Sequence, residues 1–163
     1  MYPAPDSALH ILQGMTPPAD ELNRATWALL LTQAKYKCFV DQSDSLVNIA
    51  YEYFLKGNNV HKKALSLFCK AALYEIKAQI EDALAYYLEA IKQLEFVNDN
   101  ILKYIVYGRV AFIYANRELY DYANEYMKKA NEYALLSNLP ASILSIKKSF
   151  NRVAISSSAG SAI

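Results

Sequence analysis

A repeat with a period of forty residues is the feature that most restricts how this chain can fold. Five positions between residues 71 and 90 correspond to five similar positions forty residues later: Ala71, Tyr74, Ala83, Tyr87 and Ala90 match Ala111, Tyr114, Ala123, Met127 and Ala130. A weaker copy lies forty residues earlier, where Trp27 corresponds to Leu67 and Ala50 to Ala90. Self-similarity at a period of roughly 20 to 50 residues is typical of chains built from small units that pack on their neighbours. The sequence therefore predicts an array of similar structural units.

Apolar residues recur at helical spacing along nearly the whole chain, which predicts an all-α protein. The composition agrees, because 4 Gly and 5 Pro are too few for a sheet of many short strands. We expect Asp6 or Ser7 to cap the first helix and Gly57 to help end the third. The expected helices cover residues 6–12, 19–38, a segment after Asp44 that ends at Lys56, 60–77, 80–97, 101–116, 119–136 and 141–154.

These helices group into three pairs followed by an unpaired final helix. We expect residues 1–18 to form an N-terminal extension with a short helix, residues 19–155 a helical repeat domain, and residues 156–163 a flexible tail of low complexity. A chain of 163 residues is long enough for one domain that buries roughly 70% of its unfolded surface.

The small and aromatic positions of the repeat are interpreted as packing positions. We expect Ala83 and Ala123 to lie where the two helices of a pair cross, because small side chains let helices approach closely. Tyr74, Tyr87 and Tyr114 are expected to fill the spaces between neighbouring pairs.

The sequence contains no recognisable catalytic or metal-binding motif. His10 and His61 are far apart, and no HExxH, CxxC, P-loop or GxSxG motif occurs. Glu81 and Asp82 are adjacent carboxylates, but they open a helix, where acidic side chains interact favourably with the helix dipole. Neighbouring helical side chains also diverge by about 100°, so these two would not flank one substrate. We therefore expect no enzyme, no catalytic residue, no bound metal and no cofactor.

The charge and the cysteines exclude further classes. With 17 basic and 16 acidic residues mixed along the chain, the net charge of +1 gives no basic surface for nucleic acid. The densest basic stretch, Lys147, Lys148 and Arg152, is interpreted as a solvated face. Cys38 and Cys69 are expected to be unpaired, small buried hydrophobes. No apolar run reaches the roughly 18 residues of a membrane helix, and the start MYPAPDSALH has no signal-peptide pattern.

The repeat resembles the tetratricopeptide repeat. The second copy has its spacing of bulky, small and aromatic positions, and the third copy nearly so: Leu67-x3-Ala71-x2-Tyr74 with Ala83-x3-Tyr87-x2-Ala90, then Tyr107-x2-Val110-Ala111-x2-Tyr114 with Ala123-x3-Met127-x2-Ala130. The period departs from the usual one of about 34 residues, alanine replaces the usual glycine, and no proline closes a repeat. The resemblance implies a right-handed α-α superhelix of about three helix pairs plus a final helix.

Three further stretches, PDSALHILQGM, ATWALLLTQAKYK and SDSLVNIAYEYF, look like a bacterial family of envelope tetratricopeptide proteins that begin with a lipoprotein signal. This resemblance implies a lipid-anchored protein on the periplasmic side of the cell envelope. If the chain is the complete native protein, a cytoplasmic location is expected instead.

The resemblance also implies that the first helix of each pair lines a concave groove that binds a polypeptide segment. Carried over to this sequence, the groove positions are Ala28, Thr32, Lys35 and Tyr36, then Phe68, Ala72 and Glu75, then Arg109, Phe112 and Asn116, with Lys148 and Arg152 from the last helix. Most of these residues are apolar or small, which favours an apolar or amphipathic ligand over a C-terminal carboxylate. Phe68 and Phe112 are the expected exposed anchors, and Glu75 and Arg109 would orient the bound segment.

Two functions remain open at this point. The first is a non-enzymatic protein–protein interaction module with a scaffold or regulatory role. The second is a structural or sensor region of a larger envelope regulator. In that case residues 1–18 would fill the groove, and the protein would mainly self-associate, for example as a homodimer.

Overall fold

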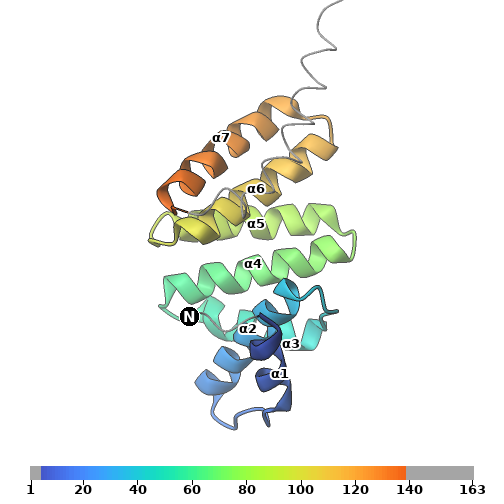
Figure 1. Ribbon diagram of the computed structural model, residues 1–163, viewed down its shortest axis with the longest axis vertical. Helices are drawn as coiled ribbons and strands as arrows, with labels where there is room; N and C mark the ends of the chain where they lie inside the picture. The colour runs from blue at the N-terminus through green and yellow to red at the C-terminus, as the bar shows by residue number, and fades with distance from the viewer. Residues whose placement is uncertain (1–4, 139–163) are drawn as a thin grey trace, which may run out of the picture. The chain divides into compact units, whose positions relative to one another are not determined.

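The computed structural model describes residues 5–138, which contain seven α-helices and no strand (Figure 1). The predicted all-α class is confirmed, and each helix end lies within a few residues of the expected one. The expected helix over 141–154 and the expected tail over 156–163 lie outside the described residues. The helices are α1 (Pro5–Gly14), α2 (Glu21–Lys37), α3 (Asp44–Lys56), α4 (Val60–Ile76), α5 (Ile80–Leu94), α6 (Asn100–Asn116) and α7 (Tyr120–Leu136).

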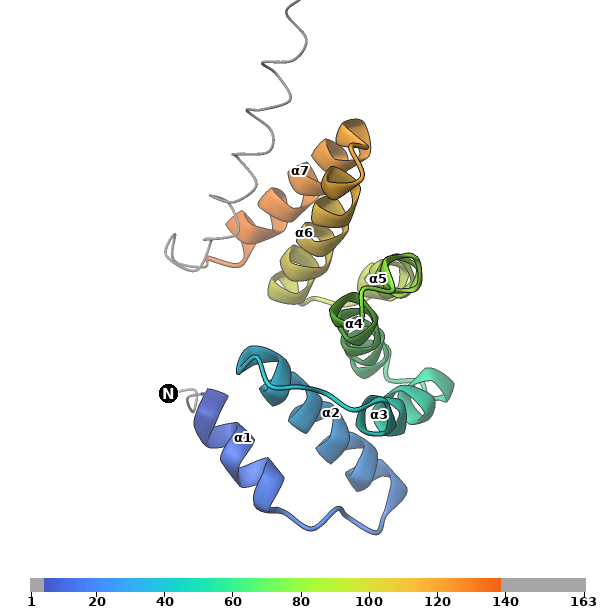
Figure 2. The same ribbon diagram turned by 90° about the vertical axis from the view of Figure 1, so that its right-hand side faces the viewer.

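The chain divides into two compact units, Met1–Phe96 and Val97–Ile163, so the expected repeat domain over 19–155 is shared between them. In the first unit α2 packs with α3 and α4 with α5, α4 also packs on α2 and α3, and α1 packs on α2 (Figure 2). In the second unit α6 packs with α7. These are the three helix pairs that the repeat predicts.

Side-chain caps explain where four of the helices begin. Asp20, Ser43, Asn59 and Asp99 each precede a helix and accept a hydrogen bond from the backbone N–H three residues further on. The predicted cap of the first helix is wrong, because α1 already begins at Pro5 and therefore includes both Asp6 and Ser7. Proline suits the first position of a helix, since its φ is fixed near the helical value and the N–H that it lacks would have no helical partner.

The first helix of each pair ends in the same backbone motif, which the sequence analysis did not predict. Phe39, Ala78 and Glu118 follow α2, α4 and α6 at successive intervals of 39 and 40 residues, and their φ angles are 55°, 59° and 61°. At Ala78, its own N–H and that of Gln79 donate to carbonyls of the last helical turn, at 3.0 and 2.9 Å. This arrangement is a Schellman motif, whose left-handed position is usually occupied by glycine. The repeat is therefore present in the backbone as well as in the side chains.

We expect Ala78→Gly to stabilise the protein. A residue other than glycine in the left-handed region is strained by roughly 1–2 kcal/mol, and glycine relieves this strain. Glycine also loses more conformational entropy on folding than alanine does, which offsets about 0.5–1 kcal/mol of the gain. The free energy of unfolding, measured by urea denaturation, should rise by about 0.5–1 kcal/mol. Ala85→Gly, at an exposed position inside α5, is the matched control and should lower it by about 1 kcal/mol. A loss of stability in both variants would contradict the strain at Ala78.

The small residues of the repeat lie in the core, as predicted. All six are buried: Ala71, Ala83, Ala90, Ala111, Ala123 and Ala130. Glu81 and Asp82 lie in the first turn of α5, as the dipole interpretation requires.

The repeat tyrosines make contacts inside their helix pairs. Tyr74 lies against Tyr86 with ring centroids 5.3 Å apart, and Tyr114 lies against Tyr122 at 5.4 Å. Tyr86 also lies 5.7 Å from Tyr51 of the preceding pair. The cluster around Tyr74 therefore reaches between pairs, as predicted, and also fills space inside its own pair.

Ala83 provides a test of the helix register. Because its side chain is fully buried between α4 and α5, Ala83→Leu should overpack the pair and cost about 1–3 kcal/mol. Lys92 is exposed on the same helix, where it pairs with Glu89, so Lys92→Ala should cost under about 0.5 kcal/mol. Equal melting temperatures for the two variants would refute this register.

Candidate functional site

The predicted groove residues of the first unit are mostly buried. Phe68 is only 4% exposed, because its ring lies between Tyr36 of α2 and Tyr87 of α5, at centroid distances of 5.2 and 6.2 Å. The prediction that Phe68 is an exposed anchor is therefore wrong. Three other groove positions are also buried: Ala28, Thr32 and Ala72.

The N-terminal helix α1 packs on α2. Trp27 of α2 donates a hydrogen bond from Nε1 to the carbonyl of Leu12, at 3.0 Å, and the Cys38 thiol donates to the Asp6 carboxylate at 3.3 Å. Both contacts join α1 to α2. The rings that cover Phe68 therefore come from neighbouring repeat helices, whereas the described part of residues 1–18 packs on α2.

The polar groove residues of the first unit are partly committed to internal bonds. Lys35 Nζ donates to the carbonyl of Asp41 at 3.2 Å. The Glu75 carboxylate accepts a hydrogen bond from the Tyr87 hydroxyl at 2.8 Å. Glu75 therefore helps to fix α4 against α5.

The three groove residues of the second unit lie together on α6. Spacings of three and four residues place Arg109, Phe112 and Asn116 on one helix face. The Arg109 guanidinium lies 5.2 Å from the centre of the Phe112 ring, and Asn116 is exposed. The structure therefore brings these three predicted residues together, with Phe112 half-buried under the guanidinium.

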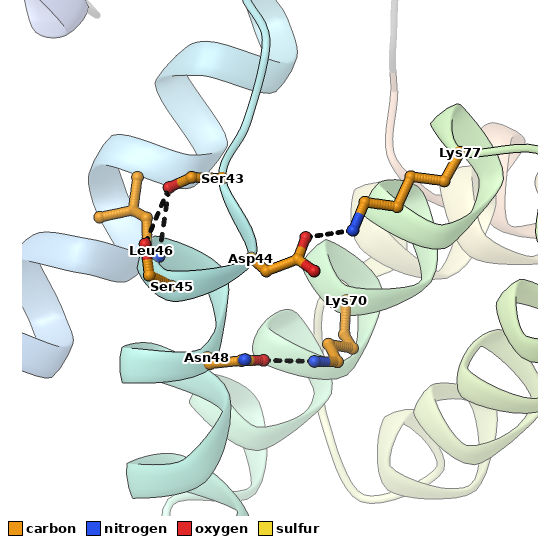
Figure 3. Close-up of polar contacts among 7 residues, drawn as sticks. All are labelled: Ser43, Asp44, Ser45, Leu46, Asn48, Lys70 and Lys77. Carbon is orange, nitrogen blue, oxygen red and sulfur yellow. Dashed lines mark hydrogen bonds and ion pairs between the residues drawn. The ribbon is translucent and has the colours of Figure 1, made fainter.

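A lysine that the sequence analysis missed is buried where α3 meets α4. Lys70 is 8% exposed, and its ammonium donates to the side-chain oxygen of Asn48 (Figure 3). The same ammonium lies 5.3 Å from the ring centre of Tyr51 and 5.4 Å from that of Tyr74. Near the start of α3, Asp44 forms an ion pair with Lys77 (Figure 3). These contacts hold neighbouring helix pairs together.

Five tyrosines form a continuous row between α6 and α7. Adjacent ring centroids in the order Tyr133, Tyr107, Tyr126, Tyr114, Tyr122 are 5.4, 5.9, 5.5 and 5.4 Å apart. Burial raises the pKa of Tyr126 above its ordinary value, and the neighbouring Tyr114 and Glu125 raise it further. This phenol therefore stays protonated near neutral pH, which suits packing and hydrogen-bond donation rather than proton transfer.

Both cysteines have free thiols, as predicted. Burial raises the pKa of Cys69 to about 12. Cys38 is only half-buried, so its prediction as a core residue is wrong, and desolvation together with the hydrogen bond to Asp6 raises its pKa. Neither thiol has the thiolate character of a reactive cysteine.

Within residues 5–138, no group of three or more His, Cys, Asp or Glu side chains could hold a metal ion. No helix of this part of the chain is long and apolar enough to cross a membrane.

An open cleft lies between the start of α2 and the end of α3. Its volume is about 570 Å³, within the range of about 300–1,000 Å³ that ligand sites in proteins usually have. The walls consist of four charged side chains, two larger uncharged ones and a glycine: Glu21, Arg24, Glu52 and Lys56, then Ile49 and Tyr53, then Gly57.

The charged side chains of this cleft make no polar contact within residues 5–138. Glu21 and Arg24 come from α2, and Glu52 and Lys56 come from α3. None of these four side chains forms an ion pair or a hydrogen bond with any other residue that the structure describes. The cleft therefore offers two carboxylates and two cations to a ligand.

Arg24 is half-buried and lines the cleft, whereas the next residue of α2, Ala25, is buried. The N-caps Asp20 and Asn59 place α2 and α4 39 residues apart. Ala25 therefore corresponds to the buried Ala64, and Arg24 corresponds to Lys63. Both copies carry a basic residue at this position, so the sequence offered no signal for the cleft.

Comparisons of this chain with protein-family models, with curated proteins and with solved structures found no match.

Proposed function

We propose that this chain is a non-enzymatic interaction module that binds a polypeptide segment, in a scaffold or regulatory role. The observation that carries the proposal is the cleft between α2 and α3. A polypeptide segment supplies charged, polar and apolar groups within a short length, which suits the mixture of side chains on the cleft walls. The raised pKa values of the thiols and of Tyr126 favour binding over acid–base or nucleophilic chemistry.

The proposed architecture is a tetratricopeptide-like, right-handed superhelix of three helix pairs and a final helix over 141–154. Its support is the recurrence of buried alanines and of the Schellman motif at the repeat interval. An envelope location, implied by the resemblance of the first two-thirds of the chain, belongs to the same proposal. Small-angle scattering of the whole chain tests the architecture, since a globular profile would contradict a superhelix.

Arg109, Phe112 and Asn116 are proposed as a second contact surface on α6. A cation over an aromatic ring presents both an apolar and a charged group to a partner, and aromatic residues and arginine often contribute most of the binding energy of an interface. Phe68 is not part of the proposed binding surface, because its ring is covered.

Self-association is a second candidate function, favoured by two aromatic side chains in connecting segments. Phe39 is 97% exposed and Phe96 is 80% exposed, and exposed apolar groups can mark interaction sites. Sedimentation equilibrium of the whole chain and of a Phe39→Ser, Phe96→Ser variant tests this role. A monomer at all concentrations would exclude it.

Peptide selection tests the main proposal. A random peptide library is displayed and selected on the whole chain, and the enriched peptides are titrated by isothermal calorimetry. Replacing Arg24 and Lys56 together by alanine should weaken binding by about tenfold or more, equivalent to about 1.4 kcal/mol. The control replaces Lys37 and Lys92, which are exposed outside the cleft, and should leave affinity unchanged. Failure to enrich any peptide, or equal affinity for both double variants, would reject the cleft as the site.

A further inference from the structure

We infer that Tyr114 and Tyr122 form a site of oxidative modification, at which a one-electron oxidant joins the two rings as an intramolecular dityrosine. The co-reactant belongs to the class of diffusing one-electron oxidants, such as a peroxidase intermediate or an oxygen-centred radical. The inference goes beyond the proposed function and does not depend on it, because it concerns the pair of α6 and α7 and not the cleft between α2 and α3.

The two phenol rings are already in contact across the turn that joins α6 to α7. Their centroids are 5.4 Å apart and their planes differ by 29°, which is a stacked arrangement of an aromatic pair. Tyr114 lies near the end of α6, and Tyr122 lies in the first turn of α7. Because exposed side chains change rotamer rapidly and helix ends fray, the Tyr122 ring can turn its edge toward Tyr114.

Tyr122 is the ring of this pair that an oxidant in solution reaches. It is 57% exposed, whereas the other four tyrosines of the row between α6 and α7 are buried or half-buried. A phenol also loses its proton when it loses an electron near neutral pH, and the water around Tyr122 can accept that proton. Burial raises the pKa of Tyr126, which makes the loss of its proton less favourable. The first oxidation therefore occurs at Tyr122.

The row allows the second electron to leave from Tyr114. The Tyr114 ring contacts Tyr126 at 5.5 Å, and Tyr126 contacts Tyr107 at 5.9 Å. Electrons exchange readily between aromatic rings in contact, so an oxidation elsewhere in the row can reach Tyr114. Two oxidised rings then lie side by side, one on each helix.

The reaction balances with two equivalents of the oxidant, each of which takes up one electron. Each phenol gives up one electron and its hydroxyl proton. A carbon–carbon bond then forms between the two ring carbons ortho to the hydroxyls. The hydrogen on each of these carbons moves to the phenolic oxygen through the solvent, which restores both aromatic rings. The product has two hydrogens fewer than the reactants and links α6 to α7 covalently.

Peptide mapping of the oxidised whole chain tests the inference. Dilute protein is treated with a peroxidase and hydrogen peroxide, and the monomer is isolated. Trypsin then releases Tyr114 in the peptide 110–117 and Tyr122 in the peptide 118–128. The expected product is these two peptides joined, with a mass two hydrogens below their sum and the fluorescence of dityrosine. Coupling of free tyrosine in a parallel reaction verifies that the oxidant is active.

Three phenylalanine variants identify the rings responsible. Tyr114→Phe and Tyr122→Phe each keep the ring and remove the hydroxyl, so either one should abolish the joined peptides. Tyr120→Phe is the matched control, because Tyr120 lies in the same turn of α7 and is also exposed, but is outside the row. This variant should retain the yield of joined peptides. Circular dichroism of all three variants checks that the helices are intact.

Each contrary result overturns the inference. Joined peptides that persist in Tyr122→Phe, or that disappear in Tyr120→Phe, would assign the coupling to another tyrosine of the peptide 118–128. Dityrosine found only in covalent dimers would show that Tyr122 couples with a second molecule faster than with Tyr114. The absence of dityrosine under conditions that couple free tyrosine would mean that the pair is not oxidised.

Discussion

Tyr87→Ala is expected to lower the free energy of unfolding by about 3–5 kcal/mol, as large aromatic truncations in a core do. Tyr87 is fully buried, and its ring packs on Phe68 while its hydroxyl donates to Glu75. Removing the ring leaves a cavity beside α4 and also deprives Phe68 of one of the two rings that cover it. Urea denaturation of the whole chain measures the effect.

Two variants separate the contributions to this loss. Tyr87→Phe keeps the ring and removes only the hydrogen bond to a half-buried carboxylate, so we expect a cost of about 1 kcal/mol. Tyr120→Ala removes an exposed tyrosine in the first turn of α7 and should cost about 0.5 kcal/mol or less. If Tyr87→Ala cost no more than Tyr120→Ala, the central packing role of Tyr87 would be refuted.

The helices themselves were predictable because local signals determine them. Apolar spacing identified each described helix, and Asp44 marked the start of α3. The buried alanines followed from the repeat, since a small residue that recurs at one position is a strong sign of close packing. The ends of α2, α4 and α6 were also predicted to within one residue, but their Schellman motifs were not, because Ala78 and Glu118 adopt a backbone conformation that their residue types do not favour.

The burial of Phe68 was not predictable from the repeat register. The register states which face of α4 a residue occupies, but not how far side chains from other helices extend over that face. Tyr36 lies on the preceding pair, and its ring covers Phe68 from outside the repeat that contains it. Groove positions inferred one repeat at a time therefore overestimate exposure wherever a neighbouring helix carries a large aromatic residue.

The cleft was not predictable from the repeat for a related reason. Its charged lining residues, Glu21, Arg24, Glu52 and Lys56, have the pattern of ordinary solvated helix faces, and their spacing does not state that a space lies between the two helices. Packing positions recur because the pairs share them, whereas the residues that line a cleft are free to vary between copies.

The buried lysine gives the other large expected effect. Asn48→Ala should cost about 1.5–3 kcal/mol, because it removes a hydrogen-bond acceptor from the buried ammonium of Lys70. The rings of Tyr51 and Tyr74 remain beside the ammonium, but a ring face replaces only part of a lost hydrogen bond.

A double-mutant cycle distinguishes this cost from simple loss of packing. Lys70→Met replaces the cation with an apolar chain of similar length and should change stability by no more than about 1 kcal/mol, since buried charges are often replaceable by hydrophobic residues. In that background no ammonium needs an acceptor, so Asn48→Ala should cost under about 1 kcal/mol. The coupling energy from urea denaturation of the four proteins should be about 1–2 kcal/mol. Additive effects, within about 0.3–0.5 kcal/mol, would mean that Asn48 stabilises the α3–α4 contact without regard to the charge of Lys70.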